Sequence, residues 1–269
     1  MNSLLQLMRP SVVILGSLGA LVGALVIGYY DIFDIVIAMF VVVLLSGAGN
    51  ALNDYYDYKI DKTNKPGRPI PSGKIKRIDA FRFATILYVA GLLLCMTLSI
   101  YCFILAIVNT ILTVIYSKKI KTMTVFGGAF PSWLAASTFL FGGLLTETVN
   151  ITILALVAIA FFGNFGREIV KDIEDIEGDK KGGKKTIPII YGEDVARAYS
   201  IICVFIAIIL MALPWVFDLL NVYYIFFILI TDIVLFRAIR HLKKNPAKSQ
   251  KLMKLAMFIV ILAFIAGTI

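Results

Sequence analysis

Apolar stretches separated by short polar connections make up most of the chain, and they constrain its fold more than any other feature. About 20 apolar residues let a helix cross the hydrocarbon core of a bilayer. We therefore expect nine membrane helices, at about residues 10–29, 32–56, 80–98, 102–116, 124–144, 151–170, 195–216, 222–239 and 252–268. Apolar residues are 60% of the total, against roughly 45–50% in soluble domains. The sequence predicts an all-α, polytopic membrane protein with one domain over residues 1–269.

The 26 lysines and arginines are confined to one set of connections. They lie in the N-terminal segment, around 59–82, 117–121, 167–197 and 237–254, or at the bordering helix ends, and the turns between carry none. Because cytoplasmic loops hold the excess of Lys and Arg, we expect the N-terminus inside and the C-terminus outside a cell membrane. Topology and attraction to anionic membrane lipids account for most of these residues, in particular Lys243, Lys244, Lys248, Lys251 and Lys254. The net charge of +9 therefore requires no nucleic-acid partner.

A row of polar side chains follows the second apolar run: Asn50, Asn53, Asp54, Asp57 and Asp61. On a helix nearly all of them share one face, because residues three or four positions apart are neighbours there. Carboxylates stacked in this way repel one another unless a cation or basic groups neutralise them. The row therefore indicates a cation site at the end of a membrane helix.

A second row repeats the first 118 residues later. Its members are Glu168, Asp172, Asp175 and Asp179, at the same spacing as Asn50, Asp54, Asp57 and Asp61. Ser46 and Asn164, one turn earlier, are also 118 apart, and each row leads into a basic loop that contains proline. One such row could be a solvated helix end, but a matched pair favours a site. The offset covers four helices, so we expect two four-helix halves and a ninth helix, with the rows facing each other across a central cavity on the cytoplasmic side.

Two facing rows of carboxylates are suited to a diphosphate carried by magnesium ions, which prefer carboxylate, phosphate and water oxygens. The expected metal ligands are Asn53, Asp54, Asp57, Asp61, Asp172, Asp175 and Asp179, of which Asp57, Asp61 and Asp175 are the candidate catalytic residues. Arg68, Lys184 and Lys185 would bind the outer phosphate oxygens. The apolar cavity would take a long, oily tail such as a polyprenyl chain. The cations would stabilise the leaving diphosphate, and a carboxylate free of metal could accept a proton.

These motifs resemble a known family. The pattern Asn53-Asp54-x-x-Asp57-x-x-x-Asp61 is similar to the first aspartate-rich motif of the UbiA superfamily of intramembrane prenyltransferases, and Asp172-x-x-Asp175-x-x-x-Asp179 is similar to the second. The resemblance extends over the whole chain and includes Tyr116, Ser117, Lys119 and Lys121 after the fourth predicted helix. It implies a helical bundle open laterally to lipid and Mg²⁺-dependent transfer of a prenyl group from its diphosphate.

Within the superfamily, residues 68–73 and 167–175 resemble the archaeal digeranylgeranylglyceryl phosphate synthase branch. That resemblance implies transfer of geranylgeranyl from its diphosphate to the free hydroxyl of geranylgeranylglyceryl phosphate, a lipid acceptor, with no obligate protein partner. An acceptor with its own phosphate needs further cations, which Lys118, Lys119, Lys121, Arg167 and Lys171 could supply. The remaining candidate substrate-binding residues are Asn50, Asn164 and Glu168.

Other functions are open at this point. Branches of the superfamily that act on aromatic quinone precursors share parts of both motifs. An ion-coupled transporter would place carboxylates near the bilayer midplane, where Asp232 falls in the eighth predicted helix. The acidic rows lie instead at helix ends on one side, which favours the enzyme. His241, the one histidine, stands alone in a basic segment and fits a solvated side chain better than a catalytic one.

Overall fold

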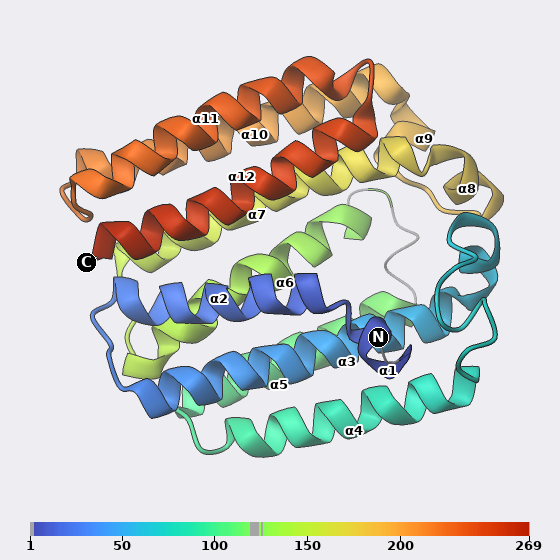
Figure 1. The fold of residues 1–269 in the computed structure, drawn as a ribbon, viewed down its shortest axis with the longest axis horizontal. Coiled ribbons are helices and arrows are strands. Elements are labelled where there is room, and N and C mark those ends of the chain that lie inside the picture. The colour runs from blue at the N-terminus through green and yellow to red at the C-terminus, as the bar shows by residue number, and fades with distance from the viewer. Residues whose placement is uncertain (1–2, 119–123, 125, 269) are drawn as a thin grey trace.

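The computed structural model describes residues 3–118, 124 and 126–268, and all regular elements in these ranges are helical. In chain order they are α1 (Ser3–Met8), α2 (Pro10–Val26), α3 (Ile32–Asn64), α4 (Arg77–Cys95), α5 (Ile100–Lys118), α6 (Phe126–Gly143), η2 (Leu144–Thr146), α7 (Ile151–Glu174), α8 (Ile176–Lys181), α9 (Ile187–Tyr191), α10 (Glu193–Val216), α11 (Val222–Leu242) and α12 (Pro246–Thr268). The long helices run side by side, with α10 to α12 at one edge of the bundle and α3 to α5 at the other (Figure 1). The predicted fold class is confirmed.

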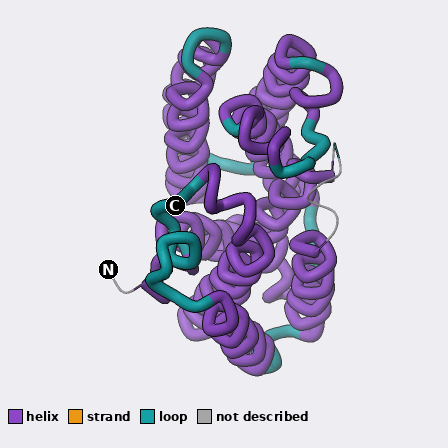
Figure 2. Tube along the Cα trace, turned by 90° about the vertical axis from the view of Figure 1, so that its right-hand side faces the viewer, coloured by secondary structure: helices purple, strands orange, loops and turns teal. Residues whose placement is uncertain are grey.

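Eight of the described helices are long and apolar enough to cross a membrane, and the shorter apolar α2 makes the ninth expected helix. The chain is thus a multi-pass membrane protein. The sequence did not predict α1, α8, α9 or η2, because each has six residues or fewer and so shows too little periodicity. Figure 2 views the bundle from the end that carries α8 and α9. The division into two four-helix halves plus α12 stays a prediction.

Helix α3 is longer than expected: it continues past Tyr56 to Asn64. Its 33 residues span about 50 Å at 1.5 Å per residue, whereas the hydrocarbon core of a bilayer is about 30 Å thick. Residues 57–64 contain neither glycine nor proline, so nothing stops the helix before Lys65, which precedes Pro66 and leaves the helical conformation. The final turns of this continuous helix therefore carry Asp57 and Asp61 beyond the apolar run.

Helices α2 and α6 pack with their backbones in close contact. A Cβ atom at Gly23 would lie 2.1 Å from the carbonyl oxygen of Phe139, and one at Gly142 would lie 1.9 Å from that of Ala20. Small residues permit such approach between membrane helices. The α2–α6 pair also contributes to both large apolar clusters, with Val22 in one and Ala20 in the other. These two helices therefore join the two sides of the bundle.

We expect Gly23→Ala to destabilise the protein by about 1–3 kcal/mol, since the added methyl group meets backbone that cannot rotate away. The thermal midpoint of purified protein in detergent would measure the effect. Gly163→Ala in α7 is the matched control, because its Cβ would have no atom within 4 Å. Equal midpoints for the two variants would contradict the prediction.

Candidate active site

The two acidic rows meet at one end of the bundle. The ammonium nitrogen of Lys65, just after α3, lies 3.6 Å from a carboxylate oxygen of Asp175, at the end of α7. Asp57 of the first row and Asp172 of the second both lie close enough to Lys184 for their negative charges to raise its pKa. Helix α3 also packs against α8 at this end (Figure 1). The expected convergence of the two rows is therefore present in the structure.

Arginines neutralise the first row. Arg68 Nη1 donates to Asp54 Oδ1 at 3.0 Å and to Asp61 Oδ2 at 2.6 Å, so one guanidinium bridges two carboxylates that are two helical turns apart. Arg9 Nη2 donates to the same oxygen of Asp54. Both aspartate side chains are at most 7% exposed. Buried carboxylates of this kind are tolerated because their charges are paired and hydrogen-bonded.

Other cations neutralise the second row. Glu168 accepts from Arg167 at 2.9 Å and from Lys171 at 2.7 Å. Lys184 lies 2.8 Å from the buried carboxylate of Asp179. Burial acts to lower the pKa of Lys184, but the hydrogen bond to Asp179 and the charge of that carboxylate outweigh it, and the pKa is raised. The ammonium form of Lys184 is thereby stabilised beside the second row.

The ammonium form of Lys65 is less stabilised than that of Lys184. Burial lowers its pKa, and the opposing influence of Asp175 does not fully compensate. Within the described residues, Asp172 takes part in no ion pair, although it lies among the charges of Lys171, Glu168, Asp179 and Lys184.

The donor atoms of the rows suit a hard divalent cation, which takes carboxylate and amide oxygens. Among these donors, the amide oxygen of Asn53 is buried and has no hydrogen-bond partner among the described residues. Over the same ranges, no three His, Cys, Asp or Glu side chains lie close enough together to hold one ion. Arg68 bridges Asp54 and Asp61, and Lys184 pairs with Asp179. The residues therefore fit Mg²⁺ by donor type, and binding would require these basic side chains to give way.

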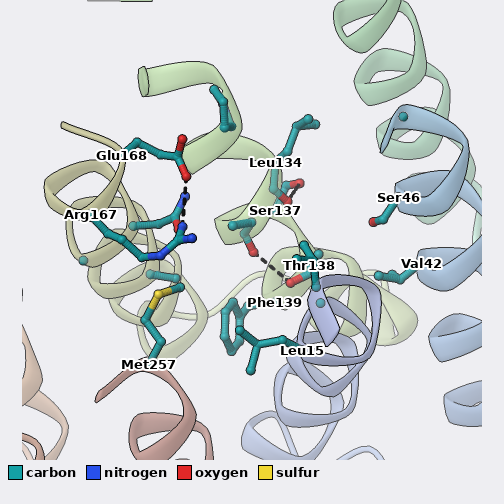
Figure 3. Close-up of a pocket in the computed structure, with 18 of the residues that line it drawn as sticks. Leu15, Val42, Ser46, Leu134, Ser137, Thr138, Phe139, Arg167, Glu168 and Met257 are labelled. Carbon is teal, nitrogen blue, oxygen red and sulfur yellow. Dashed lines mark hydrogen bonds and ion pairs between the residues drawn. The ribbon is translucent and has the colours of Figure 1, made fainter. Parts of the chain in front are cut away.

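A cavity of about 460 Å³ lies beside the rows. Its polar lining includes Arg9, Asn50, Asn53, Tyr116, Ser117, Asn164, Arg167, Glu168 and Lys171, and residues such as Leu15, Val42, Phe139 and Phe264 form its apolar wall. Figure 3 shows Arg167 and Glu168 across the cavity from Ser137 and Thr138 of α6. The aspartates of the two rows are not among its lining residues: Asp54 and Asp172 directly follow the lining residues Asn53 and Lys171, and the other aspartates come further along the chain. The cavity is thus apolar over much of its wall and becomes polar toward the acidic rows.

Several expected site residues have local partners. The amide nitrogen of Asn50 donates to the carbonyl of Met8, which anchors the junction between α1 and α2. Tyr116 donates to the carbonyl of Gly127 and stacks on Phe130 with 4.7 Å between ring centroids. Asn164 accepts from Arg167 at 3.3 Å. These side chains shape the cavity wall as well as facing it.

Other expected residues are placed less favourably. Lys185 and Lys118 are exposed, so neither is brought into the cavity or against the rows. Lys184, the neighbour of Lys185 in the loop, is the residue that pairs with Asp179. Lys119 and Lys121 lie outside the described residues. Ser117 lines the cavity, and its hydroxyl is buried with no hydrogen-bond partner among the described residues.

Arg9 is a site residue that the sequence did not single out. It separates α1 from α2 and has φ 56° and ψ 70°, a left-handed conformation that is uncommon for a residue with a long side chain. Pro10 then starts α2. The turn directs the guanidinium to Asp54 and into the cavity lining. In the sequence, the positive-inside rule alone accounts for a single arginine before the first membrane helix, so nothing marks Arg9 as a site residue.

We expect Lys184→Gln to lower the free energy of unfolding by about 1–3 kcal/mol, because it leaves the buried carboxylate of Asp179 unpaired. Lys185→Gln, at the exposed neighbouring position, should have no effect. Thermal unfolding of both variants in detergent at neutral pH would measure the difference. If the two midpoints agree, the ion pair contributes nothing to stability.

Known proteins resemble this chain along its whole length. The model of the UbiA prenyltransferase family matches residues 16–262. The digeranylgeranylglyceryl phosphate synthase of Methanococcoides burtonii is 36% identical, over 99% of this chain and 100% of the relative. A solved structure of digeranylgeranylglyceryl phosphate synthase is 37% identical, with a TM-score of 0.79 over 99% of this chain and 97% of that one.

A UbiA homologue from Archaeoglobus fulgidus, solved with DMAPP and Mg²⁺, shares the fold at 21% identity, with a TM-score of 0.74 over 99% of both chains. This likeness concerns the fold alone. The family match and the full-length relatives go further, since they cover the acidic rows, the cavity helices and the connections between them. The chain belongs to the UbiA prenyltransferase family.

Proposed function

We propose that this protein transfers a geranylgeranyl group from geranylgeranyl diphosphate to the free hydroxyl of geranylgeranylglyceryl phosphate, in a Mg²⁺-dependent reaction. The product carries the second ether bond of an archaeal membrane lipid. The observation that carries the proposal is the meeting of two carboxylate rows beside an apolar cavity. Relatives of the same length that bear the name digeranylgeranylglyceryl phosphate synthase support this choice of substrates.

The donor's diphosphate would bind at the junction of the rows. Magnesium, held by Asn53, Asp54, Asp57, Asp61, Asp172, Asp175 and Asp179, would neutralise the diphosphate and stabilise it as a leaving group. Arg68 and Lys184 already lie at the carboxylates. Once the carboxylates bind the metal ions, the guanidinium and the ammonium can turn to the outer phosphate oxygens. These side chains thus serve as counter-ions in both states.

The isoprenoid tail of the donor would occupy the cavity. Its walls include Leu15, Val42, Phe139 and Phe264, and its volume of about 460 Å³ lies in the usual range for small-molecule sites. Each buried methylene stabilises the bound tail by about 0.8 kcal/mol. The apolar wall also keeps water from the allylic carbon, which would otherwise be hydrolysed as positive charge develops on it.

In the reaction, the bond between the allylic carbon and the diphosphate oxygen breaks, and the acceptor's hydroxyl oxygen forms the new ether bond. The hydroxyl proton passes to a carboxylate, for which Asp57, Asp61 and Asp175 are the candidates. By the distribution of Lys and Arg, the rows face the cytoplasm, with the N-terminus inside and the C-terminus outside. Donor and acceptor would both reach the site from that side of the membrane.

The first test is product formation by membranes that contain the protein. We expect labelled geranylgeranyl diphosphate and geranylgeranylglyceryl phosphate to yield the diether phosphate with Mg²⁺, and no product once a chelator is added. Aromatic quinone precursors, offered in parallel, should accept no label. Transfer to an aromatic acceptor instead of the glycerol lipid would overturn the assignment of the acceptor.

The second test concerns the carboxylates. Asp175→Asn should reduce the rate by a factor of about 10²–10³, typical for loss of one group that stabilises the transition state, and leave a folded protein. Glu174→Gln is the matched control, since Glu174 is exposed beside it. Rates would be measured at saturating Mg²⁺. A near-normal rate for Asp175→Asn would exclude that residue from the metal ligands.

A further inference from the structure

Lys254 lies in the cavity wall, although the sequence assigns it a role in topology. It is on the face of α12 that lines the cavity, together with Gln250, Met253 and Met257. Its ammonium nitrogen lies 3.4 Å from the hydroxyl of Ser11 on α2. Over the described residues it forms no ion pair with a carboxylate, and it is only partly exposed. A cation in this position lacks the counter-ion that most of its neighbours have.

The other cations of the cavity wall have partners. Arg9 pairs with Asp54, while Arg167 and Lys171 share the one carboxylate of Glu168. Among the described residues that line the cavity, Glu168 is the sole acid. The four cations of the cavity wall outnumber the carboxylates that pair with them, Asp54 and Glu168, by two; Asp172, which follows Lys171, is not part of the wall. The cavity wall can therefore neutralise an anion of about two charges.

The geometry places these surplus charges on the same side of the cavity. Helices α7 and α12 run in opposite directions next to each other (Figure 1). Figure 3 shows Met257 of α12 beside Arg167 of α7. Lys254 is one turn before Met257 and Lys171 is one turn after Arg167, so both lie toward the end of the bundle that carries the acidic rows. Arg68 and Lys184 pair with row aspartates and do not line the cavity, although Arg68 shares one oxygen of Asp54 with the cavity residue Arg9.

We propose that Lys254 binds the phosphate monoester of the acceptor lipid, with Gln250 one turn earlier on α12 and Lys171 on the neighbouring helix α7. The proposal rests on the proposed function, because it assigns the acceptor's headgroup to one part of that site. A phosphate monoester carries about 1.5 to 2 negative charges at neutral pH, which matches the surplus. An acceptor phosphate bound at Lys254 leaves Arg68 and Lys184 available to bind the donor's diphosphate. Lys254 is then a specificity-determining residue, selecting acceptors with a phosphate.

The test uses purified full-length Lys254→Gln, with Lys251→Gln as the matched control because Lys251 is exposed on the same helix. We expect the KM for geranylgeranylglyceryl phosphate to rise roughly tenfold, as for loss of one charged hydrogen bond. The KM for geranylgeranyl diphosphate and the rate with phosphate-free geranylgeranylglycerol should not change. Lys254→Arg should restore most of the affinity, and Lys251→Gln should behave as the wild type.

A loss that is equal for both acceptors, a raised KM for the donor, or an unchanged KM for the phosphorylated acceptor would each overturn the assignment. Equilibrium binding of the acceptor without donor separates this outcome from failure of the proposed function. If the wild type binds the phosphorylated lipid about tenfold more tightly than Lys254→Gln but forms no product, the function fails and the phosphate site stands. If phosphatidylglycerol competes as well as the acceptor, the site holds a general lipid headgroup and the proposal is wrong.

Discussion

Charge pairing between buried carboxylates and basic side chains is the interaction on which the site depends. Asp54, Asp61 and Asp179 are almost fully enclosed at the end of an apolar bundle, where an unpaired carboxylate would be strongly destabilising. Arg68 and Lys184 supply the opposite charges from the loops that follow each row. The same loops therefore stabilise the protein and place cations where a diphosphate would bind. Structure and proposed chemistry use one set of electrostatic contacts.

Much of this arrangement follows from the sequence because helices have a fixed period. The spacing shared by Asp54, Asp57 and Asp61 and by Asp172, Asp175 and Asp179 predicts that each set lies along one side of a helix. The first set does lie on α3, whereas α7 ends at Glu174 and Asp179 lies on the separate helix α8. The apolar runs and the bias of Lys and Arg locate the membrane helices. These features predicted the fold class and the meeting of the rows. The assignment of individual ligands and catalytic residues stays a prediction.

The remaining features depend on packing between segments far apart in the chain. Arg9 reaches Asp54 only because α1 and α2 meet at a left-handed residue, and Lys254 faces inward only because α12 packs on α2 and α7. In the sequence both look like ordinary cations at a membrane surface. In the sequence, Lys184 and Lys185 are equally plausible ligands for phosphate oxygens, and the path of the loop places Lys184 against Asp179 and leaves Lys185 exposed. The expected membrane span ended at Tyr56, and the polar turns that carry Asp57 and Asp61 continue the same helix to Asn64.

The close contact between α2 and α6 has a consequence for substrate traffic. The backbones of α2 and α6 are in contact where Gly23 faces Phe139 and where Gly142 faces Ala20. Sliding or separating these two helices would therefore disrupt their packing. Both helices also contribute to the cavity wall. A bulky lipid product would therefore leave the cavity between other helices, and the packing of α2 on α6 would stay unchanged during its release.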